Sequence, residues 1–393
     1  MNKKDVANFR KQLKLDNDLL RITDIFNVYV RKESNEVYHY ESHPFSLLDR
    51  EQQELFMANF KKVLTGQLDI KLFELKFQTE IEMENHTRNV LHGSLQLEDI
   101  DDWIEQMLLM VEKMFKNRQY EMDVVVSFIR GTFFQPLKKK NEATEDNERD
   151  EVTVHPFILC SINKTEQPKK TLLFDFIGKE FKSHVVVDAV INLTAPLGGF
   201  LYPCFTDGYS DVNHILYCSG KANEPDYYLI EDVLNGEAIT TAMEEKVVFE
   251  EIVKHVVGEQ VNAETLANVY EEINQMIEVE KEEGEEEPRL DYKDVERVLK
   301  ASGVENVDIE KVEAAFQTVI DDESYELKAT SILPKYNSKS IKISTKVANI
   351  AISPQDLKYI RQVTVNGKKC VLIEVEEDID IEGFKLIPET LLS

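Results

Sequence analysis

The spacing of apolar residues in the first part of the chain predicts helices and one pair of strands. Apolar residues recur at every third or fourth position in three segments, which is the pattern of a helix with one buried face. These helices are expected at residues 3–16, 50–65 and 100–115. In the second, Asp49 and Gln52 have the spacing of a capping box, and Gly66 is expected to end the helix. Before it, β-branched and aromatic residues flank the polar turn Lys32–Asn35 and predict two strands.

The middle of the chain has the pattern of a sheet. Short runs of β-branched and aromatic residues alternate with polar turns, which is typical of buried strands. These runs are DVVVSFIRGTFF, HPFILCSI, TLLFDFI, VVVDAVINL, GGFLYPCF and HILYCSG. The charged segment KKKNEATEDNERDE separates the first two and is expected to be an exposed loop, because it has no large apolar residue to anchor it.

Helical spacing returns after residue 240. AMEEKVVFEEIVKHVVG and a segment that begins near Asn262 predict two helices, and the second leads into EVEKEEGEEEP, an acidic run expected to be a solvated linker. LDYKDVERVLKASG and VDIEKVEAAFQTVI predict two shorter helices, and KSIKISTKVANIAI predicts a strand. The pair Asn366-Gly367 between two strand-forming runs predicts a β-hairpin, because both residues tolerate a positive φ angle.

Together these patterns predict an α+β protein. It has a helical N-terminal region, a central mixed or antiparallel β-sheet domain and a small C-terminal α+β module with a β-hairpin. The expected divisions are an N-terminal α+β region at 1–119, the sheet-rich domain at 120–235, a helical segment with the acidic linker at 236–288, and the C-terminal module at 289–393. The methionine-containing stripe at 100–115 is expected in a core, although such stripes also form adaptable binding grooves.

The charge of the chain limits its partners. Among 393 residues, 46 Lys and Arg stand against 74 Asp and Glu, which gives a net charge of −28. Such a surface repels phosphate groups, so we expect no direct binding of nucleic acid and no binding to a membrane. The simplest interpretation is solubility. An acidic surface also suits a protein that imitates nucleic acid toward a basic protein, and this alternative stays open.

The sequence also predicts a cytoplasmic location. The charged N-terminus lacks the apolar core of a signal peptide, and no window approaches the roughly 18 apolar residues that cross a bilayer. The cysteines form no CxxC pair. Cys160, Cys204 and Cys218 lie in apolar runs, as expected for reduced and buried thiols.

Familiar catalytic motifs are not evident. The sequence has neither GxxxxGK[ST] nor GxGxxG after a strand, and it lacks GxSxG, HExxH and the twelve-residue calcium loop. We therefore assign no catalytic residue, no metal and no cofactor from the sequence. The absence of these motifs favours a protein without enzymatic activity.

The stretch FTDGYSDVNHILYCSG, residues 205–220, is the main candidate for a binding site. Its polar residues are Asp207, Ser210, Asp211, Asn213 and His214. The spacing DxxxDxxH allows Asp207, Asp211 and His214 to converge on a divalent cation, and His214 with Asp211 can act as an oriented general base. Asp-Gly and Ser-Asp are also ordinary turn sequences. The favoured interpretation is a connection between strands, and contact with a ligand or partner is the next alternative.

Arg130 is the remaining candidate. It follows the strand run DVVVSFI and precedes Gly131, so it can pair with Asp207 or Asp211. Such a pair would fix the turn or form part of a polar pocket for a zwitterionic group. The other histidines have no metal-ligand spacing and are expected at the surface or hydrogen-bonded.

Several of these sequences resemble a bacterial, mainly Gram-positive, family known as domain of unknown function 4317. They are MNKKDVANFRKQ, FIRGTFF followed by HPFILCSI, and GGFLYPCFTDGYSDVNHILYCSG. The resemblance covers nearly the whole chain and implies its architecture and location, but no mechanism. In the family, the turn after the aromatic strand contains a basic residue. Gly208 and Tyr209 replace that part here, which counts against phosphate binding by this turn.

Three hypotheses for function follow. The leading one is a non-enzymatic binding or regulatory protein that engages another, unidentified protein, because catalytic motifs are missing and the surface is acidic. The second is a metal-dependent hydrolase or phosphodiesterase that uses Asp207, Asp211 and His214. The third is an acidic nucleic-acid mimic.

Overall fold

The computed structural model divides the chain into two compact units. We call Met1–Thr241 the sheet unit and Ala242–Ser393 the helical unit. The structure describes residues 1–79, 85–136, 152–166, 170–185, 188–206, 208–237, 239–258, 263–283, 288–320, 325–333, 341–375, 379–381 and 384–385. The segment KKKNEATEDNERDE, for which a loop was predicted, lies outside the described residues.

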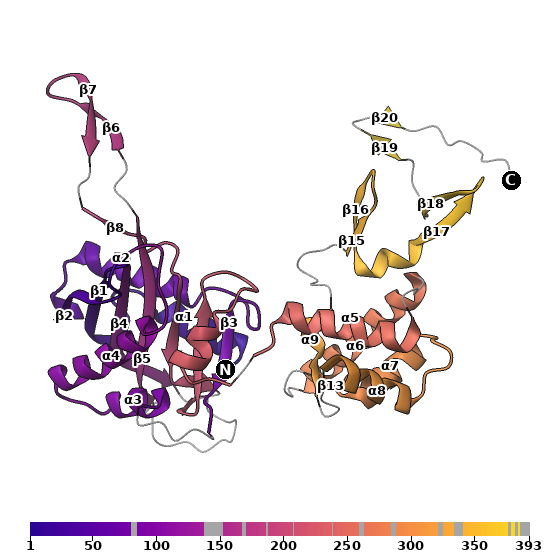
Figure 1. Ribbon diagram of the computed structural model, residues 1–393, viewed down its shortest axis with the longest axis horizontal. Coiled ribbons are helices and arrows are strands. Elements are labelled where there is room, and N and C mark those ends of the chain that lie inside the picture. Colours follow the sequence, from indigo (N-terminus) through magenta and orange to yellow (C-terminus); the bar gives the residue numbers. More distant parts are fainter. Residues whose placement is uncertain are drawn as a thin grey trace, which may run out of the picture. The chain divides into compact units, whose positions relative to one another are not determined.

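An antiparallel sheet forms the centre of the sheet unit (Figure 1). Its strands are β1 (Leu20–Val30), β2 (Val37–Pro44), β3 (Leu72–Lys76), β4 (Val124–Pro136), β5 (Val152–Glu166), β8 (Val190–Ile191), β9 (Gly198–Tyr202) and β12 (His214–Ser219). They lie in the order β2-β1-β4-β5-β9-β12-β3, and β8 pairs with the end of β5. The segments before and after residue 119 therefore contribute strands to one sheet. The predicted α+β class with an antiparallel central sheet is confirmed.

Helices cover both faces of this sheet. The helical elements are α1 (Lys3–Gln12), the 3₁₀ turn η1 (Phe45–Leu47), α2 (Arg50–Val63), α3 (Thr87–Ser94), α4 (Ile100–Phe115) and the π-helical turn η2 (Tyr228–Val233). Successive strand residues point to opposite faces, so the strands supply two cores. In one core, Phe60 of α2 is buried with strand residues such as Phe157. In the other, Trp103 and Phe128 pack with α3, α4 and η2. The buried Met107 confirms that the methionine stripe belongs to a core.

Local signals set most of the helix ends. Asp49 accepts a hydrogen bond from the N–H of Gln52 at 2.8 Å, which confirms the predicted cap. The predicted cap at Gly66 is wrong, because α2 ends at Val63 and its last turn closes through Leu64. Helix α1 ends at Gln12, before the predicted end at residue 16, because the side chain of Asn17 donates to the Gln12 carbonyl at 2.6 Å.

Two small hairpins complete the sheet unit. The first pairs β6 (Lys170–Asp175) with β7 (Glu180–Val185), and it follows β5 in the chain. The second pairs β10 (Cys204–Thr206) with β11 (Tyr209–Asp211) and lies between β9 and β12 in the chain.

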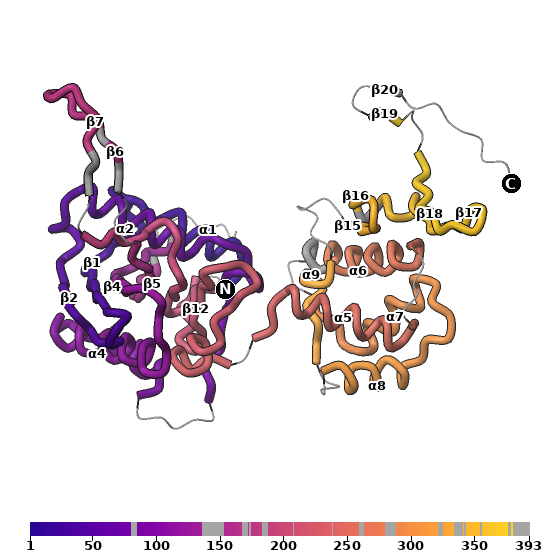
Figure 2. The backbone as a smooth tube through the Cα atoms, turned by 45° about the horizontal axis from the view of Figure 1, so that its top comes forward, coloured from indigo at the N-terminus to yellow at the C-terminus, as the bar shows by residue number. Residues whose placement is uncertain are grey.

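The helical unit has a core of its own, and Figure 2 traces the backbone of its helices. Its elements are α5 (Ala242–Val257), α6 (Ala263–Glu283), β13 (Arg289–Leu290), α7 (Tyr292–Ala301), α8 (Ile309–Ile320), β14 (Leu327–Lys328), α9 (Ala329–Ile332), β15 (Ile341–Ser344), β16 (Asn349–Ile352), η4 (Pro354–Tyr359), β17 (Ile360–Val365), β18 (Lys368–Ile373), β19 (Asp380–Ile381) and β20 (Phe384–Lys385). Phe249, Ile273 and Phe316 are buried together. In the part of the chain that the structure describes, no helix is long and apolar enough to span a bilayer.

The C-terminal predictions have different outcomes. The hairpin at Asn366-Gly367 is confirmed, with φ angles of 49° and 77° at the turn. KSIKISTKVANIAI forms the two strands β15 and β16 instead of one, because the hydroxyl of Thr345 accepts a hydrogen bond from the N–H of Ala348 at 2.8 Å and fixes a turn. Helix α6 continues to Glu283, so the first part of the acidic run is helical.

Substitution of Gly199 by alanine is expected to destabilise the sheet unit. A methyl group on Gly199 in β9 would overlap the carbonyl oxygen of Cys160 and lie 2.9 Å from Cγ1 of Val63. Overpacking of this kind costs about 1–3 kcal/mol in the free energy of unfolding. The measurement is urea unfolding followed by the fluorescence of Trp103, the only tryptophan.

Gly93→Ala in α3 is the matched control. A methyl group on Gly93 has no neighbouring atom within 4 Å, so this helical substitution should be neutral or stabilising. Equal unfolding midpoints for the two alanine variants would contradict the packing described for β9.

Candidate functional site

The predicted polar turn connects strands. β10 and β11 pair Cys204 with Asp211 and Thr206 with Tyr209. Gly208 has a φ angle of +92°, which favours glycine at this position in the turn. Asp207 lies outside the described residues. The described part of the stretch thus forms a hairpin and the connection from that hairpin into β12.

Ser210 binds the buried His155, one of the histidines expected at the surface or hydrogen-bonded. Oγ of Ser210 lies 2.7 Å from Nδ1 of His155, and Nε2 of His155 lies 2.8 Å from Oγ1 of Thr153. The His155 ring packs against the rings of Phe133 and Phe205. Burial lowers the pKa of His155 below its usual value, so the neutral imidazole is favoured. This contact fixes β11 against β5.

Asp211, Asn213 and His214 form a second local network. Nδ1 of His214 lies 2.6 Å from Oδ2 of Asp211, and Oδ1 of Asp211 accepts the N–H of Asn213 at 2.9 Å. The side-chain oxygen of Asn213 accepts a hydrogen bond from Nε of Arg88 at 3.1 Å. The Asp211–His214 pair expected from the sequence is therefore present, and both carboxylate oxygens of Asp211 are engaged within the turn.

Arg130 does not join Asp211. Its Nε lies 2.7 Å from Oδ2 of Asp24, and its guanidinium donates to the carbonyl of Leu97 at 2.9 Å. The same group lies 5.0 Å from the ring centroid of Trp103. The physical reason is the strand register, which places Asp24 of β1 directly opposite Arg130 of β4. Arg130 was predicted to pair with Asp207 or Asp211; the structure pairs it with Asp24, and Asp207 lies outside the described residues.

The predicted site residues do not form a metal centre in the described part of the chain. Within those residues, no group of three or more His, Cys, Asp and Glu side chains is placed to hold a metal ion. The hydrolase hypothesis also requires Asp207, whose position is not described, and it stays a prediction. The nucleic-acid mimic likewise stays a prediction.

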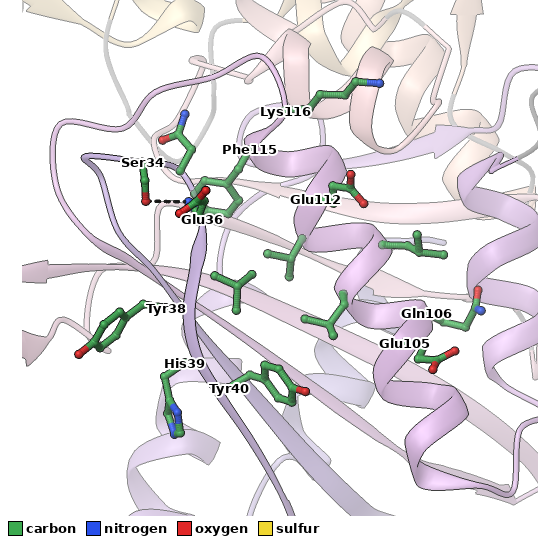
Figure 3. Close-up of a pocket in the computed structure, with 15 residues that line it drawn as sticks. Ser34, Glu36, Tyr38, His39, Tyr40, Glu105, Gln106, Glu112, Phe115 and Lys116 are labelled. Atoms are coloured by element: carbon green, nitrogen blue, oxygen red, sulfur yellow. Dashed lines mark hydrogen bonds between the residues drawn. The ribbon is translucent and has the colours of Figure 1, made fainter.

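A groove of about 1220 Å³ between β2 and α4 is a second candidate site (Figure 3). Its apolar and aromatic lining residues include Val37, Tyr38, Tyr40, Leu108, Leu109, Val111 and Phe115. The ring of Tyr40 points from β2 toward α4, whereas Tyr38 points to the other side of the strand. The groove therefore has the ring of Tyr40 on its strand wall, and aliphatic side chains together with the ring of Phe115 on its helix wall.

A β-bulge explains the opposite directions of the two tyrosines. The register of β1 and β2 shifts between Tyr29 and Val30, which leaves Tyr38 as the extra residue. Tyr38 packs on Tyr29 with ring centroids 6.1 Å apart. Tyr40 packs edge-on against Phe26, a residue of the α4-side core, with centroids 5.8 Å apart.

The outer edge of β2 is open. β2 is the terminal strand of the sheet and, within the described residues, pairs only with β1. Alternate residues of an edge strand direct their N–H and C=O groups outward. At the opposite edge, β3 is covered, because Glu237 N–H binds the Lys76 carbonyl at 2.8 Å and Gln78 N–H binds the Asn235 carbonyl at 2.9 Å. Of the two edges, β2 is the one whose outer side has no strand partner within the described residues.

The rim of the groove is acidic. Glu36, Glu105 and Glu112 line it together with one lysine, Lys116. All four side chains are exposed. Three carboxylates and one ammonium group give this rim a net negative charge.

Sequence reasoning missed this groove, although one signal for its strand wall is present. VYHYESHP has no regular apolar face and ends in Pro44, a composition typical of edge strands. The position of α4 beside that edge has no local signal, because α4 follows β2 by more than fifty residues in the chain.

Comparison with known families now identifies the chain. A family model described as a domain of unknown function, DUF4317, matches residues 1–384. The chain belongs to this family. The DUF4317 match confirms the resemblance noted in the sequence, while the bacterial origin implied by that resemblance stays a prediction. A search of curated proteins finds no match.

Lowering the pH from 7.5 to 5.5 is expected to destabilise the sheet unit. Burial lowers the pKa of His155 and of His86 below about 6.5, the value in the unfolded chain. As the pH falls through this value, the unfolded state binds more protons than the folded state, so stability present above it is lost below it. Each histidine contributes at most about 1.4 kcal/mol per pH unit.

The test compares urea unfolding at the two pH values. The double variant His86→Gln/His155→Gln should depend less on pH than the wild type, whereas His39→Gln, at an exposed position, should leave the dependence unchanged. An unchanged dependence in the double variant would show that the buried histidines do not control it.

Proposed function

We propose that this chain is a non-enzymatic, cytoplasmic protein that binds another protein by holding an extended segment of it along β2. The observation that supports this proposal is the open edge of β2 beside an apolar groove. A segment that adds to a sheet edge gains backbone hydrogen bonds along its length, and adjacent pockets select alternate side chains.

The dimensions of the groove favour a polypeptide. Pockets for small molecules typically enclose about 300–1,000 Å³ and surround most of the ligand. This groove has a volume of about 1220 Å³ and runs between a strand and a helix at the surface. A peptide in extended conformation matches this shape, because one of its edges pairs with β2 while side chains on one face enter the groove.

The lining residues define the chemistry of the segment. Leu108, Val111 and Phe115 favour aliphatic or aromatic side chains at alternate positions. Glu105 and Glu112 on the rim favour a lysine or arginine next to them. The proposed ligand is therefore an extended segment with alternating apolar residues and at least one basic residue.

The thiols support the cytoplasmic part of the proposal. Burial raises the pKa of Cys160 and Cys204, and it raises the pKa of Cys218 to about 12. These groups remain neutral thiols inside the core. Free buried thiols are typical of proteins from reducing compartments.

Tyr40→Asp is expected to weaken binding of extended peptides to the groove. The probe is a set of ten-residue peptides selected from a random phage-displayed library against the full chain. Loss of a buried aromatic contact of about 1.5–3 kcal/mol lowers affinity by at least about tenfold. Fluorescence anisotropy with the synthetic peptides measures the change.

Leu55→Asp is the matched control, because Leu55 is 56% exposed on α2, on the other face of the sheet. It should leave affinity unchanged. N-methylation of alternate peptide residues should weaken binding in only one of the two registers, as edge pairing requires. Selected peptides that bind the Tyr40→Asp variant as tightly as the wild type would overturn the proposal.

A further inference from the structure

The β6–β7 hairpin has a tip of defined shape. Asp175 and Glu180 face each other at the end of the two strands. Oδ1 of Asp175 accepts the N–H groups of Ile177 at 2.9 Å and Gly178 at 3.0 Å. Nζ of Lys182 lies 2.7 Å from Asp175 and 2.9 Å from Glu180. These bonds hold the turn in one conformation.

This ordered tip presents apolar side chains to solvent. Phe176 is 84% exposed, Ile177 is 97% exposed and Phe181 is 72% exposed. Phe174 joins them into one cluster, because its ring lies 5.2 Å from that of Phe176 and 5.1 Å from that of Phe181. A contiguous apolar patch of this kind marks a contact surface.

The hairpin also has two open edges. Within the described residues, β6 and β7 pair only with each other. An isolated two-stranded hairpin is only marginally stable in water. Addition to a further strand would complete its backbone hydrogen bonds and cover its aromatic cluster.

We propose that a second copy of this chain supplies that strand: the hairpin of one copy lies along β2 of the other, with its aromatic cluster in the groove between β2 and α4. This inference rests on the proposed function of the groove, because it names the segment that pairs with the edge of β2 and fills the groove between β2 and α4.

The two surfaces match in chemistry. Within the described residues both offer an unpaired strand edge, and in the proposed dimer the aromatic cluster of the hairpin packs against apolar groove residues such as Leu108 and Phe115. Asp175, Lys179, Glu180 and Lys182 give the tip a net charge of zero in a chain of net charge −28. The tip can therefore approach the acidic rim of another copy without the repulsion that opposes other contacts. Lys179 supplies a cation for the rim carboxylates.

The topology places both surfaces at one end of the sheet. Val37 of β2 pairs with Val30, Val30 pairs with Val124, and Val124 pairs with Lys164 of β5. β5 ends at Glu166, immediately beyond this row, and the hairpin follows it. Phe115, the last residue of α4, lines the groove beside Val37. Two copies that meet at these ends can exchange hairpins reciprocally, which gives a closed twofold dimer.

This exchange would regulate access to the groove, because dimer formation blocks it. In the dimer each groove holds a hairpin, so a partner segment binds only by displacing it. Partner binding and self-association then compete for the same site, and each weakens the other by the same factor.

The experiment is sedimentation equilibrium of the full chain and three variants. The wild type should form dimers with increasing concentration. Phe176→Asp/Ile177→Asp, which alters the hairpin, and Tyr40→Asp, which alters the groove, should each raise the dimer dissociation constant at least tenfold. Val347→Asp in the helical unit, 94% exposed in the wild type, is the control and should dimerise normally.

A mixture of the hairpin variant and the groove variant decides the arrangement. Such a pair retains one intact hairpin and one intact groove that fit each other, so a mixed dimer should form at concentrations at which each variant alone is monomeric. If no mixed dimer forms, hairpin-in-groove exchange is refuted. A wild type that stays monomeric would also refute it, including one whose hairpin tip binds vesicles of anionic lipid. Selected peptides that still bind the groove of a monomeric chain would leave the proposed function intact while refuting this inference.

Discussion

The central constraint on the antiparallel sheet of residues 1–241 is that helices cover both of its faces, which leaves its edges as the places where backbone groups can meet another chain. Helices α1 and α2 cover one face, while α3, α4 and η2 cover the other. Backbone hydrogen bonds from residues 235–237 cover the β3 edge. Within the described residues, the outer edge of β2 has no strand partner, and the groove lies beside it. Our proposal therefore places recognition at this one edge of the sheet.

His155 and Arg130 each join one strand to a neighbouring segment of the chain. His155 binds hydroxyl groups at both ring nitrogens and fixes the β10–β11 hairpin to β5. Arg130 bridges β4 to Asp24 of β1 and to the Leu97 carbonyl. These contacts satisfy polar groups at the borders of the cores, where an unpaired group would cost about 1–3 kcal/mol. They stabilise the frame that supports the groove.

Much of the secondary structure could be predicted from the sequence because its signals are local. Asp49 and Gln52 are three residues apart, and the Asn366-Gly367 turn is formed by adjacent residues. The site contacts join distant parts of the chain: Ser210 and His155 are 55 residues apart, and Arg130 and Asp24 are 106 residues apart. Strand register brings these residues together, and a single sequence does not specify that register. The groove could not be predicted for the same reason, because its two walls, β2 and α4, are far apart in the sequence.

Hydrogen exchange at the backbone amides of β2 is the most direct test of the proposal that an extended segment pairs with the edge of this strand. The measurement compares the free chain with the chain bound to a selected peptide. If the peptide pairs with β2, exchange should slow at the outward-facing amides between His39 and Ser42, at alternate positions, with little change in β3. Unchanged exchange along β2 in a complex that forms would contradict edge pairing as the mode of recognition.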